Sequence, residues 1–317
     1  MTPLSLSGDA VITAPSLEAH LATRSGNAAL TGIACAIAHA AAPIAARLAQ
    51  AGLPGDPAQI VGTNDSGDRQ KALDRAAHEH LLEALARVDV RAVVSEEAED
   101  EITLHPVGRY DVAIDPIDGS GSIGIGAPLG LLFCVFEAGN TLQRPGTEVI
   151  AAGYVSFGHS TDMGLSLGNG VDLFTLDPAS GRFHLAREQV RIPENKPMIA
   201  YNASNTGHWP APLRDHVETR IEAGANMRWI AAAVGDLHRI LLQGGIFLYP
   251  ADARKGYENG RLRLLYEAFP IAYLIEQAGG AATDGTTRIL DCITERLHQH
   301  SPLIFCDRDM VAAIPRH

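Results

Sequence analysis

The sequence lacks the features that mark several large classes of protein. Its 317 residues carry 25 Lys and Arg against 37 Asp and Glu, a formal charge of −12, so the basic surface that binds nucleic-acid phosphates is missing. The four cysteines lie far apart without a Cys-x-x-Cys pair, which disfavours a zinc site or a disulfide framework. No uninterrupted apolar run reaches the ~18 residues of a membrane helix, and the N-terminus does not resemble a secretory signal. We therefore expect a cytoplasmic protein that binds neither nucleic acid nor membrane.

Several familiar catalytic signatures are missing as well. There is no Gly-x-Ser-x-Gly nucleophile elbow and no Walker A lysine loop, which disfavours a serine hydrolase and a P-loop NTPase. His78 and His80 are two positions apart, so on a helix they point in different directions and do not form a metal-ligand pair. The glycines of residues 119–126 imitate a dinucleotide-binding loop, but the carboxylates that precede them would repel a pyrophosphate.

Helical periodicity and short apolar runs follow one another along the chain and predict an α+β fold. Helices are expected over residues 30–51, 68–88, 210–223, 232–243 and 267–278. Strands are expected over residues 90–95, 110–114, 130–137, 149–157, 171–177, 182–186, 198–201, 245–250 and 303–306. The polar segment 191–197, with a proline near each end, is the best candidate for a domain boundary.

The segment Asp115–Ser122, with the sequence Asp-Pro-Ile-Asp-Gly-Ser-Gly-Ser, carries the strongest chemical signal. Its two carboxylates bracket a proline, and small residues follow, so we expect a turn that points both acids at one place. Backbone N–H groups of residues 119–122 would then form a phosphate site beside ligands for a hard cation. A bare pattern of this kind is more often a surface turn, and the acidic run after Ser95 is by itself typical of a solvated surface. Combined with the acids near residues 68–74 and at Glu267, these carboxylates predict a magnesium site.

These segments resemble class I fructose-1,6-bisphosphatase, within the superfamily of lithium-sensitive phosphatases that includes inositol monophosphatase. The motif of residues 115–120 belongs to the whole superfamily, whereas the matches over 244–250 and 260–267 are more specific. The resemblance extends in order over residues 30–307. It implies a layered α-β-α-β-α sandwich with the active site between two domains: an N-terminal metal- and phosphate-binding domain, 1–192, and a C-terminal sugar-phosphate-binding domain, 193–317. It also implies a homotetramer in which Arg228 reaches a neighbour's site.

The resemblance assigns roles to individual residues. Two or more Mg²⁺ ions, with Mn²⁺ as a possible substitute, would be bound by Glu96, Asp115, Asp118, Glu267 and the carbonyl of Ile117. Glu97 and Asp74 would accept or relay the proton of the attacking water, and Asp68 would help to organise the metal-bound form. The substrate would be bound by Asp118, Gly119, Ser120, Gly121, Asn202, Arg228, Trp229, Phe247, Leu248, Tyr249, Arg261 and Arg263.

This sequence departs from the family pattern at several places. Gly121 and Ser122 replace a Ser-Asn pair, Trp229 stands where tyrosine is common, and Arg261 replaces a lysine. The Gly-Thr-Gly-Glu pattern of the family's AMP loop is missing, whereas residues 109–110 match the basic and aromatic pair of that site, so AMP inhibition stays open.

The prediction that follows is hydrolysis of D-fructose 1,6-bisphosphate to D-fructose 6-phosphate and phosphate, in gluconeogenesis or the Calvin cycle. The nearest alternatives are sedoheptulose-1,7-bisphosphatase and inositol monophosphatase activity. A non-enzymatic sugar-phosphate sensor is a third alternative, which the complete set of carboxylates disfavours because a silent relative has no reason to retain every ligand.

Overall fold

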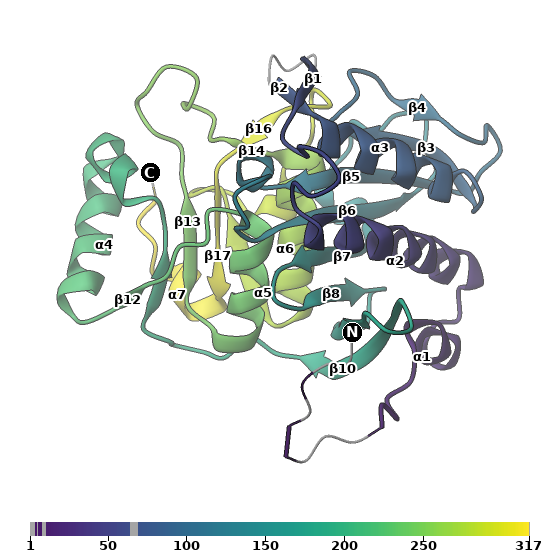
Figure 1. Cartoon of the computed structure of the whole chain (residues 1–317). Coiled ribbons are helices and arrows are strands. Elements are labelled where there is room, and N and C mark those ends of the chain that lie inside the picture. The colour runs from purple at the N-terminus through teal and green to yellow at the C-terminus, as the bar shows by residue number, and fades with distance from the viewer. Residues whose placement is uncertain (1–3, 5, 8–10, 64–68, 317) are drawn as a thin grey trace.

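Two β-sheets separated by helices make up the computed structural model, which describes residues 4, 6–7, 11–63 and 69–316 (Figure 1). The larger sheet has eight strands in the order β10-β9-β8-β7-β6-β5-β3-β4, and the smaller has five in the order β12-β11-β13-β17-β15. Helices α2 and α3 cover one face of the larger sheet, α5 and α6 lie between the sheets, and α4 and α7 cover the smaller one (Figure 1). This layering confirms the predicted α-β-α-β-α sandwich.

The elements of the structure have the following bounds. The helices are α1 (Leu17–Arg24), α2 (Ala28–Ala49), α3 (Ala72–Leu85), α4 (Ala211–Glu222), α5 (Ala233–Gln243), α6 (Phe269–Gln277) and α7 (Arg308–Ala312). The larger sheet and the short β1–β2 ribbon contain β1 (Ile60–Thr63), β2 (Arg69–Lys71), β3 (Val90–Ser95), β4 (Ile102–Thr103), β5 (Tyr110–Asp118), β6 (Leu129–Glu137), β7 (Val149–Phe157), β8 (Thr161–Ser166), β9 (Val171–Asp177) and β10 (Arg182–Val190). The remaining strands are β11 (Met198–Ala200), β12 (Asn226–Met227), β13 (Ile246–Tyr249), β14 (Leu262–Arg263), β15 (Gly280–Thr283), β16 (His300–Ser301) and β17 (Leu303–Asp307).

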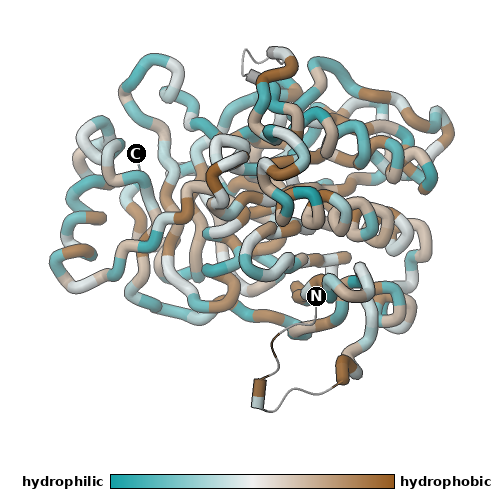
Figure 2. Tube along the Cα trace, viewed as in Figure 1, coloured by the Kyte–Doolittle hydropathy of each residue, from teal (hydrophilic) through white to brown (hydrophobic). Residues whose placement is uncertain are grey.

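The centre of the larger sheet is buried on both faces. Strands β6 and β7 are therefore nearly continuous apolar runs rather than alternating ones, and β5 is buried at every position although it carries three aspartates. One face packs against α1–α3 and the other against α5 and α6, and hydrophobic residues concentrate along these central elements (Figure 2). A sheet held from both sides fixes the position of its strand ends, where β3 and β5 bring the acidic residues.

Helix α2 forms part of this outer covering. It begins after Asn27, whose side chain accepts a hydrogen bond of 3.0 Å from Leu30 N, and it continues through Pro43. Among the described residues it is the one helix whose length and apolar composition would allow it to cross a membrane. Its buried side chains, which include Ile33 and Ile37, belong instead to the core on the larger sheet.

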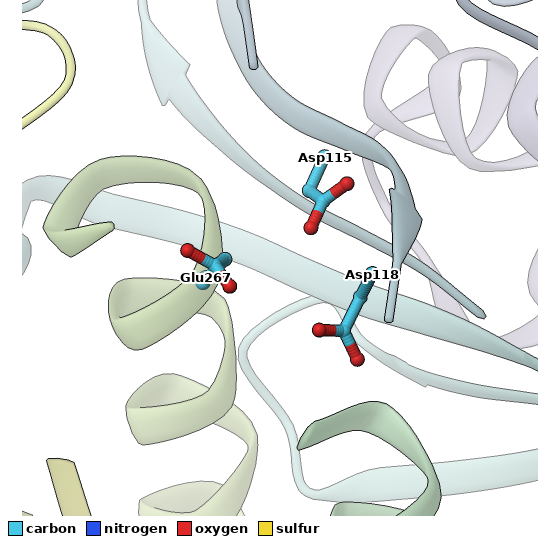
Figure 3. Close-up of side chains that lie close together, drawn as sticks. All are labelled: Asp115, Asp118 and Glu267. Carbon is cyan, nitrogen blue, oxygen red and sulfur yellow. The ribbon is translucent and has the colours of Figure 1, made fainter. Parts of the chain in front are cut away.

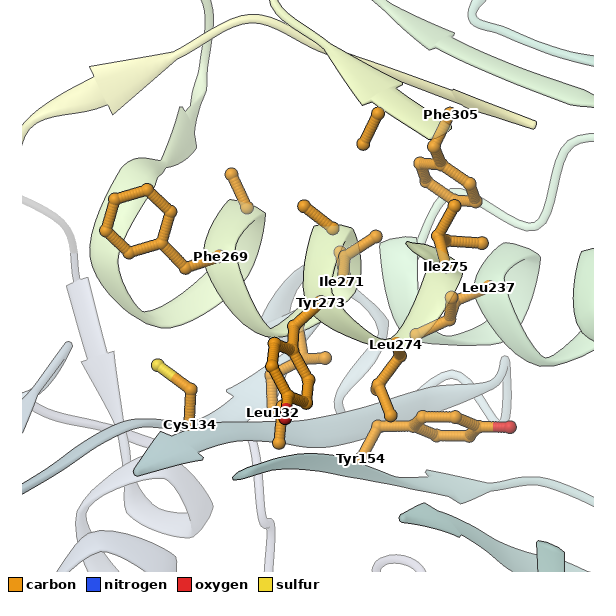
Figure 4. Close-up of a cluster of buried hydrophobic side chains, with 14 of the residues drawn as sticks. Leu132, Cys134, Tyr154, Leu237, Phe269, Ile271, Tyr273, Leu274, Ile275 and Phe305 are labelled. Carbon is orange, nitrogen blue, oxygen red and sulfur yellow. The ribbon is translucent and has the colours of Figure 1, made fainter. Parts of the chain in front are cut away.

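Helix α6 forms the middle layer together with α5. Every residue from Phe269 to Ile275 is buried, because the helix packs on one sheet through Leu274 and on the other through Ile275 (Figure 4). Leu132 and Tyr154 lie on one side of α6, and Phe305 lies on the other (Figure 4). A helix that is apolar all round in this way is typical of the interior of a larger protein.

Several sequence-based expectations differ from the structure, and helices α1 and α7 and strand β15 were not predicted. The helix expected over 68–88 begins only at Ala72, because residues 69–71 form β2 and pair with β1; Asp68 lies outside the described residues. The strand expected over 110–114 continues to Asp118. Strand β8 was not predicted, since its sequence mixes polar and apolar residues without a clear alternation.

Candidate metal and phosphate site

Three carboxylates from distant parts of the sequence converge at the end of β5. Ligand oxygens of Asp115, Asp118 and Glu267 all lie within 4.8 Å of one another, and Figure 3 shows the three side chains directed toward a common space. The residues are 1%, 5% and 6% exposed, respectively. Buried carboxylates at this spacing repel one another unless protons or a cation neutralise them, so the group is suited to hold a hard divalent cation.

The local backbone of β5 explains how two acids three positions apart reach the same space. The sequence analysis expected a turn through these residues, but the strand continues through Asp118, and its pairing with β6 shifts register between Asp115 and Asp118. Ile117 N donates to Asp115 Oδ1 at 2.9 Å within this irregularity. A bulge of this kind redirects side chains that would otherwise alternate between the two faces.

The sharp turn comes one residue later, at Gly119. Its φ of +79° lies in the left-handed region, and a Cβ there would lie 2.7 Å from the Cβ of Ala232. Glycine is therefore required by both conformation and space. The next residues form a short 3₁₀ turn, Ser120–Ser122, directly after the Asp118-Gly119 pair.

Glu267 reaches the site from a π-helical turn, Leu264–Ala268, that leads into α6. The backbone N–H of Arg263 donates to its carboxylate. A π turn inserts one extra residue into a helix and is frequent at functional sites, because it rotates a side chain away from the regular helical position. The sequence analysis expected the helix to begin at Glu267 and did not foresee this turn.

Glu96 completes the cluster from the turn after β3. It remains partly exposed and shares a hydrogen bond with the Asp115 carboxyl group. Burial, together with the charges of Glu97 and Asp118, raises the pKa of Glu96 to about 7. Burial and the Glu96 charge likewise raise the pKa of Asp115 well above its ordinary range.

The other two carboxylates are perturbed for the same reasons. Burial raises the pKa of Asp118 to about 6, although a hydrogen bond of 2.7 Å from Val234 N opposes this rise. Burial and the charges of Glu96 and Asp118 raise the pKa of Glu267 well above its ordinary range. Without a cation the cluster therefore retains protons near neutral pH, and a bound divalent cation would displace them.

The N-terminus of α5 is a contributor that the sequence analysis missed. Gly130 of β6 pairs with Asp118, and a Cβ at Gly130 would come within 2.4 Å of a Val234 side-chain methyl. The glycine thus lets α5 begin directly over Asp118, where the positive end of the helix and the Val234 N–H favour a carboxylate. The sequence did contain a signal for this contact. A helix was expected to start at residue 232, and Gly130 lies in an apolar strand where only a closely packed neighbour would require glycine.

The two described candidates for proton transfer are Glu97, whose charge affects the pKa of Glu96, and Asp74, whose pKa Glu97 affects in turn. Gln70 Nε2 donates to Glu97 Oε2 at 2.7 Å. Asp74, which is 3% exposed, accepts from Lys71 N at 3.1 Å, while its Oδ1 is buried without a hydrogen bond from the described residues. Burial raises the pKa of Asp74 to about 7, and the Glu97 charge acts in the same direction.

Lys71 also contacts the 3₁₀ turn of Ser120–Ser122. Its Nζ donates to the carbonyl of Ser120 at 2.6 Å, a contact to which the sequence analysis gave no role. Ser122 N in turn donates to Gly119 O at 2.8 Å, which closes the 3₁₀ turn. No described atom outside the neighbouring residues lies within 4 Å of a Cβ placed on Gly121, so that residue faces open space.

Three of the predicted sugar-binding residues form an aromatic group. Trp229 stacks on Phe247 with ring centroids 5.6 Å apart and contacts Tyr249 edge-on at 5.9 Å. Leu248 points to the opposite face of β13 and is fully buried in the core of α4 and α7, so its side chain lies away from this group. Asn202 caps a short helical turn by accepting from Ser204 N at 3.1 Å.

The three arginines differ in their surroundings. The guanidinium of Arg261 donates to Tyr257 Oη at 2.6 Å and lies 5.1 Å from the centroid of that ring. Arg263 donates to the carbonyl of Arg261 at 3.1 Å, and its charge opposes the rise in pKa of Glu96 and Glu267. Arg228 is exposed and donates to the carbonyl of Met227 at 2.9 Å.

Arg109 and Tyr110, the pair that matches the family's AMP site, both form side-chain contacts with other residues of this chain. The Arg109 guanidinium forms an ion pair with Asp89, and Tyr110 Oη accepts a hydrogen bond of 2.7 Å from Asn27 Nδ2.

Comparison with known family models gives the class of the protein. The model described as Fructose-1-6-bisphosphatase, N-terminal domain matches residues 11–188, and the model of the C-terminal domain matches residues 192–317. Both halves of the chain, and hence both sources of the carboxylate cluster, are those of a phosphatase.

Individual relatives narrow this class to one family. The chain is 46% identical over 279 residues to a Brucella suis protein named Fructose-1,6-bisphosphatase class 1, an alignment that covers 85% of this chain and 82% of the relative. It also resembles the crystal structure of Leishmania major fructose-1,6-bisphosphatase in holo form, with a TM-score of 0.89, 33% identity, and coverage of 95% of this chain and 97% of that one. The apo form of the same protein gives a TM-score of 0.84 at 30% identity, covering 95% and 99%. The chain belongs to the class 1 fructose-1,6-bisphosphatase family.

Proposed function

We propose that this protein catalyses the Mg²⁺-dependent hydrolysis of D-fructose 1,6-bisphosphate to D-fructose 6-phosphate and phosphate. The observation that carries the proposal is the buried cluster of Asp115, Asp118 and Glu267 directly beside the left-handed turn at Gly119. In a member of this family, that combination supports a site where cation and phosphate are held together.

The cation ligands that we propose are Glu96, Asp115, Asp118, Glu267 and the carbonyl of Ile117. All are oxygens, which suits Mg²⁺ and admits Mn²⁺, and two or more ions would balance a cluster of this charge. When bound, such ions activate water and stabilise the leaving oxygen. The raised pKa of each carboxyl supports this assignment, since groups placed so close to one another are stabilised as anions only by positive charge.

For proton transfer we propose Glu97 and Asp74, with Asp68 organising the metal-bound form. Asp74 combines a buried, unpaired oxygen with a pKa raised to about 7, which is the range in which a carboxylate is an effective base near neutral pH. Glu97 is held by Gln70 and lies close enough to raise the pKa of Asp74, so the protonation of Asp74 depends on the charge of Glu97.

The phosphate that is removed would bind to Asp118–Gly121, through backbone N–H groups of the turn that Lys71 holds. The sugar and its second phosphate would bind among Asn202, Arg228, Trp229, Phe247, Leu248, Tyr249, Arg261 and Arg263. We assign residues 1–192 to metal and phosphate binding and 193–317 to sugar-phosphate binding, with Glu267 as the contribution of the second part to the metal site.

The second phosphate distinguishes this proposal from an inositol monophosphatase. Arg261 and Arg263 are two positions apart and in contact, in a chain that is otherwise acidic. An inositol monophosphate has no second phosphate and would need no such pair. Arg261 already lies against the Tyr257 ring, an arrangement that leaves part of its fork of donors for a phosphate.

We further propose a cytoplasmic homotetramer in which Arg228 contributes to a neighbour's site. The exposed position of Arg228, whose guanidinium donates to the neighbouring backbone carbonyl of Met227, supports this role. The reaction would serve gluconeogenesis or the Calvin cycle.

A substrate panel tests the proposal. Purified protein with Mg²⁺ is expected to release phosphate from fructose 1,6-bisphosphate with a higher kcat/KM than from sedoheptulose 1,7-bisphosphate or inositol 1-phosphate. A preference for the sedoheptulose compound would move the assignment to the first alternative, and a preference for the inositol compound to the second. Tight binding of these compounds without phosphate release would indicate a sugar-phosphate sensor.

A further inference from the structure

Two of the proposed cation ligands sit on segments that are not neighbours in the sequence. Glu96 lies in the turn after β3, and Glu267 lies on the π turn before α6. A cation that both residues bind requires a fixed distance between these two backbones, because a displacement of about 1 Å is enough to disturb a metal site. What holds the two segments at that distance is therefore part of the function.

A third segment, residues 295–301, crosses beside the π turn and is fixed to it. Its strand β16 pairs with β14, so that Arg263 lies opposite His300 (Figure 1). Leu264 N, the first residue of the π turn, donates to Gln299 O at 2.8 Å. The segment therefore holds a fixed position relative to Glu267.

His298 extends from this segment to both ligand-bearing turns. Its Nδ1 lies 2.8 Å from Tyr266 Oη, and its Nε2 lies 3.2 Å from the carbonyl oxygen of Glu99. Tyr266 precedes Glu267 on the π turn and is fully buried, while Glu99 belongs to the turn that carries Glu96. The imidazole thus joins the two segments through one ring.

The chemistry of these partners fixes the direction of the hydrogen bonds. A carbonyl oxygen only accepts, so Nε2 of the neutral imidazole must carry the proton and donate it to Glu99 O. Nδ1 is then the acceptor, and the hydroxyl of Tyr266 donates to it. Both bonds run in one direction, from the π turn through His298 to the Glu96 turn, and the ring can make both only in this single tautomer.

We propose that His298 is a positioning residue of the metal site, which acts by linking the π turn of Glu267 to the turn of Glu96 through Tyr266 and the Glu99 carbonyl. It touches neither the substrate nor the cation. The inference rests on the proposed function, because it requires that these carboxylates bind a divalent cation. Outer residues that orient metal ligands typically change metal affinity about 10- to 100-fold when they are replaced.

The test measures Mn²⁺ binding to metal-free protein by isothermal titration calorimetry, so that it does not depend on turnover. We expect His298→Ala and Tyr266→Phe each to weaken Mn²⁺ binding about tenfold. Because both variants break the same link, the double variant is expected to stay near the same tenfold loss instead of reaching about a hundredfold.

Gln299→Ala is the matched control. Gln299 Oε1 accepts from Glu295 N at 2.7 Å, so this change loosens the same segment without contacting Tyr266 or Glu99. We expect it to lower the Tm of the metal-free protein and to leave Mn²⁺ affinity within about twofold. Two results would overturn the role of His298 and leave the proposed metal site intact. One is equal Mn²⁺ affinity of the wild type and the His298 variant, and the other is a loss of Mn²⁺ affinity in Gln299→Ala as large as in His298→Ala. A wild type that bound no Mn²⁺ would overturn the proposed metal site and the inference with it.

Discussion

The charge of the carboxylate cluster should make the stability of the metal-free protein depend on pH in a direction that the structure fixes. The pKa of Glu96 is raised from 4.5 to about 7 by burial and by neighbouring acids, and the pKa of Asp118 is raised to about 6. A carboxyl whose pKa is higher in the folded chain binds more protons there than in the unfolded chain. The metal-free fold is therefore favoured below about pH 4 and loses this contribution as the pH rises through about 7.

The size of the effect follows from the same shift. A change from 4.5 to about 7 at Glu96 corresponds to roughly 3 kcal/mol. The neighbouring carboxyls share protons with Glu96, so their contributions are not added to this value. At roughly 2 °C for each kcal/mol in a chain of this size, the Tm should fall by about 6 °C over the whole titration, from below about pH 4 to above about pH 8.

The assay is thermal unfolding at about pH 5.5 and about pH 8.5, in EDTA and in saturating Mg²⁺, for the wild type and two variants. Between these two pH values the Glu96 shift changes stability by about 2 kcal/mol, since the rest of the change lies below about pH 5.5. In EDTA, the wild type should therefore lose about 4 °C more than Glu96→Gln over this interval, because the amide has no charge to bury. Mg²⁺ should raise the wild-type Tm more at the higher pH, and this gain should shrink in Glu96→Gln.

Glu99→Gln is the matched control for this experiment, because Glu99 is exposed in the same turn and its side chain lies outside the cluster. It should behave as the wild type does. Parallel pH dependences of the wild type and Glu96→Gln in EDTA, or a Mg²⁺ gain that is larger at the lower pH, would refute this reasoning.

Three further predictions concern single residues. Glu97→Gln should lower kcat at least about tenfold with little change in KM, measured by steady-state phosphate release; an unchanged kcat would remove Glu97 from proton transfer. Gly119→Ala should lower the free energy of unfolding in urea by about 1–3 kcal/mol and raise KM, because the φ of Gly119 is +79° and its Cβ would lie 2.7 Å from that of Ala232. Gly121→Ala is the control, because a Cβ at Gly121 meets open space, and its free energy of unfolding should stay within about 0.5 kcal/mol of the wild type. Equal stability of the two glycine variants would contradict the assigned geometry. Arg261→Ala should raise KM for the bisphosphate about tenfold and leave kcat near wild type; the reverse pattern would place Arg261 in the chemical step.

Much of the fold could be predicted from the sequence because the larger sheet is buried on both faces. Strand β3 was expected at Val90–Ser95 and is found there, and β7 was expected at Val149–Phe157 and is found there. Both are apolar runs that end at polar residues or glycine, where local pattern and tertiary environment agree. The helix start at Ala72 could not be predicted, because the residues just before it form a strand that pairs with β1, an earlier segment of the chain, and helical periodicity does not reveal this pairing.

The site was harder to predict, because its geometry depends on departures from regular structure. Local sequence indicates a turn at Asp115-Pro116, yet pairing with β6 keeps the segment in the sheet and places the turn at Gly119. The π turn of Glu267 likewise has no local signal, since its position depends on packing between α6 and the larger sheet. Residue type identified the carboxylates, but only the tertiary structure could show that they meet.

The central claim is that these carboxylates hold a divalent cation and thereby remove a phosphate from fructose 1,6-bisphosphate. The most direct measurement is the initial rate of phosphate release from this compound in Mg²⁺ and in EDTA, for the wild type and for Asp118→Asn. We predict release that requires Mg²⁺ in the wild type, and a rate lowered at least about a hundredfold in the variant. Release that continued undiminished in EDTA, or that was unaffected by Asp118→Asn, would contradict the account.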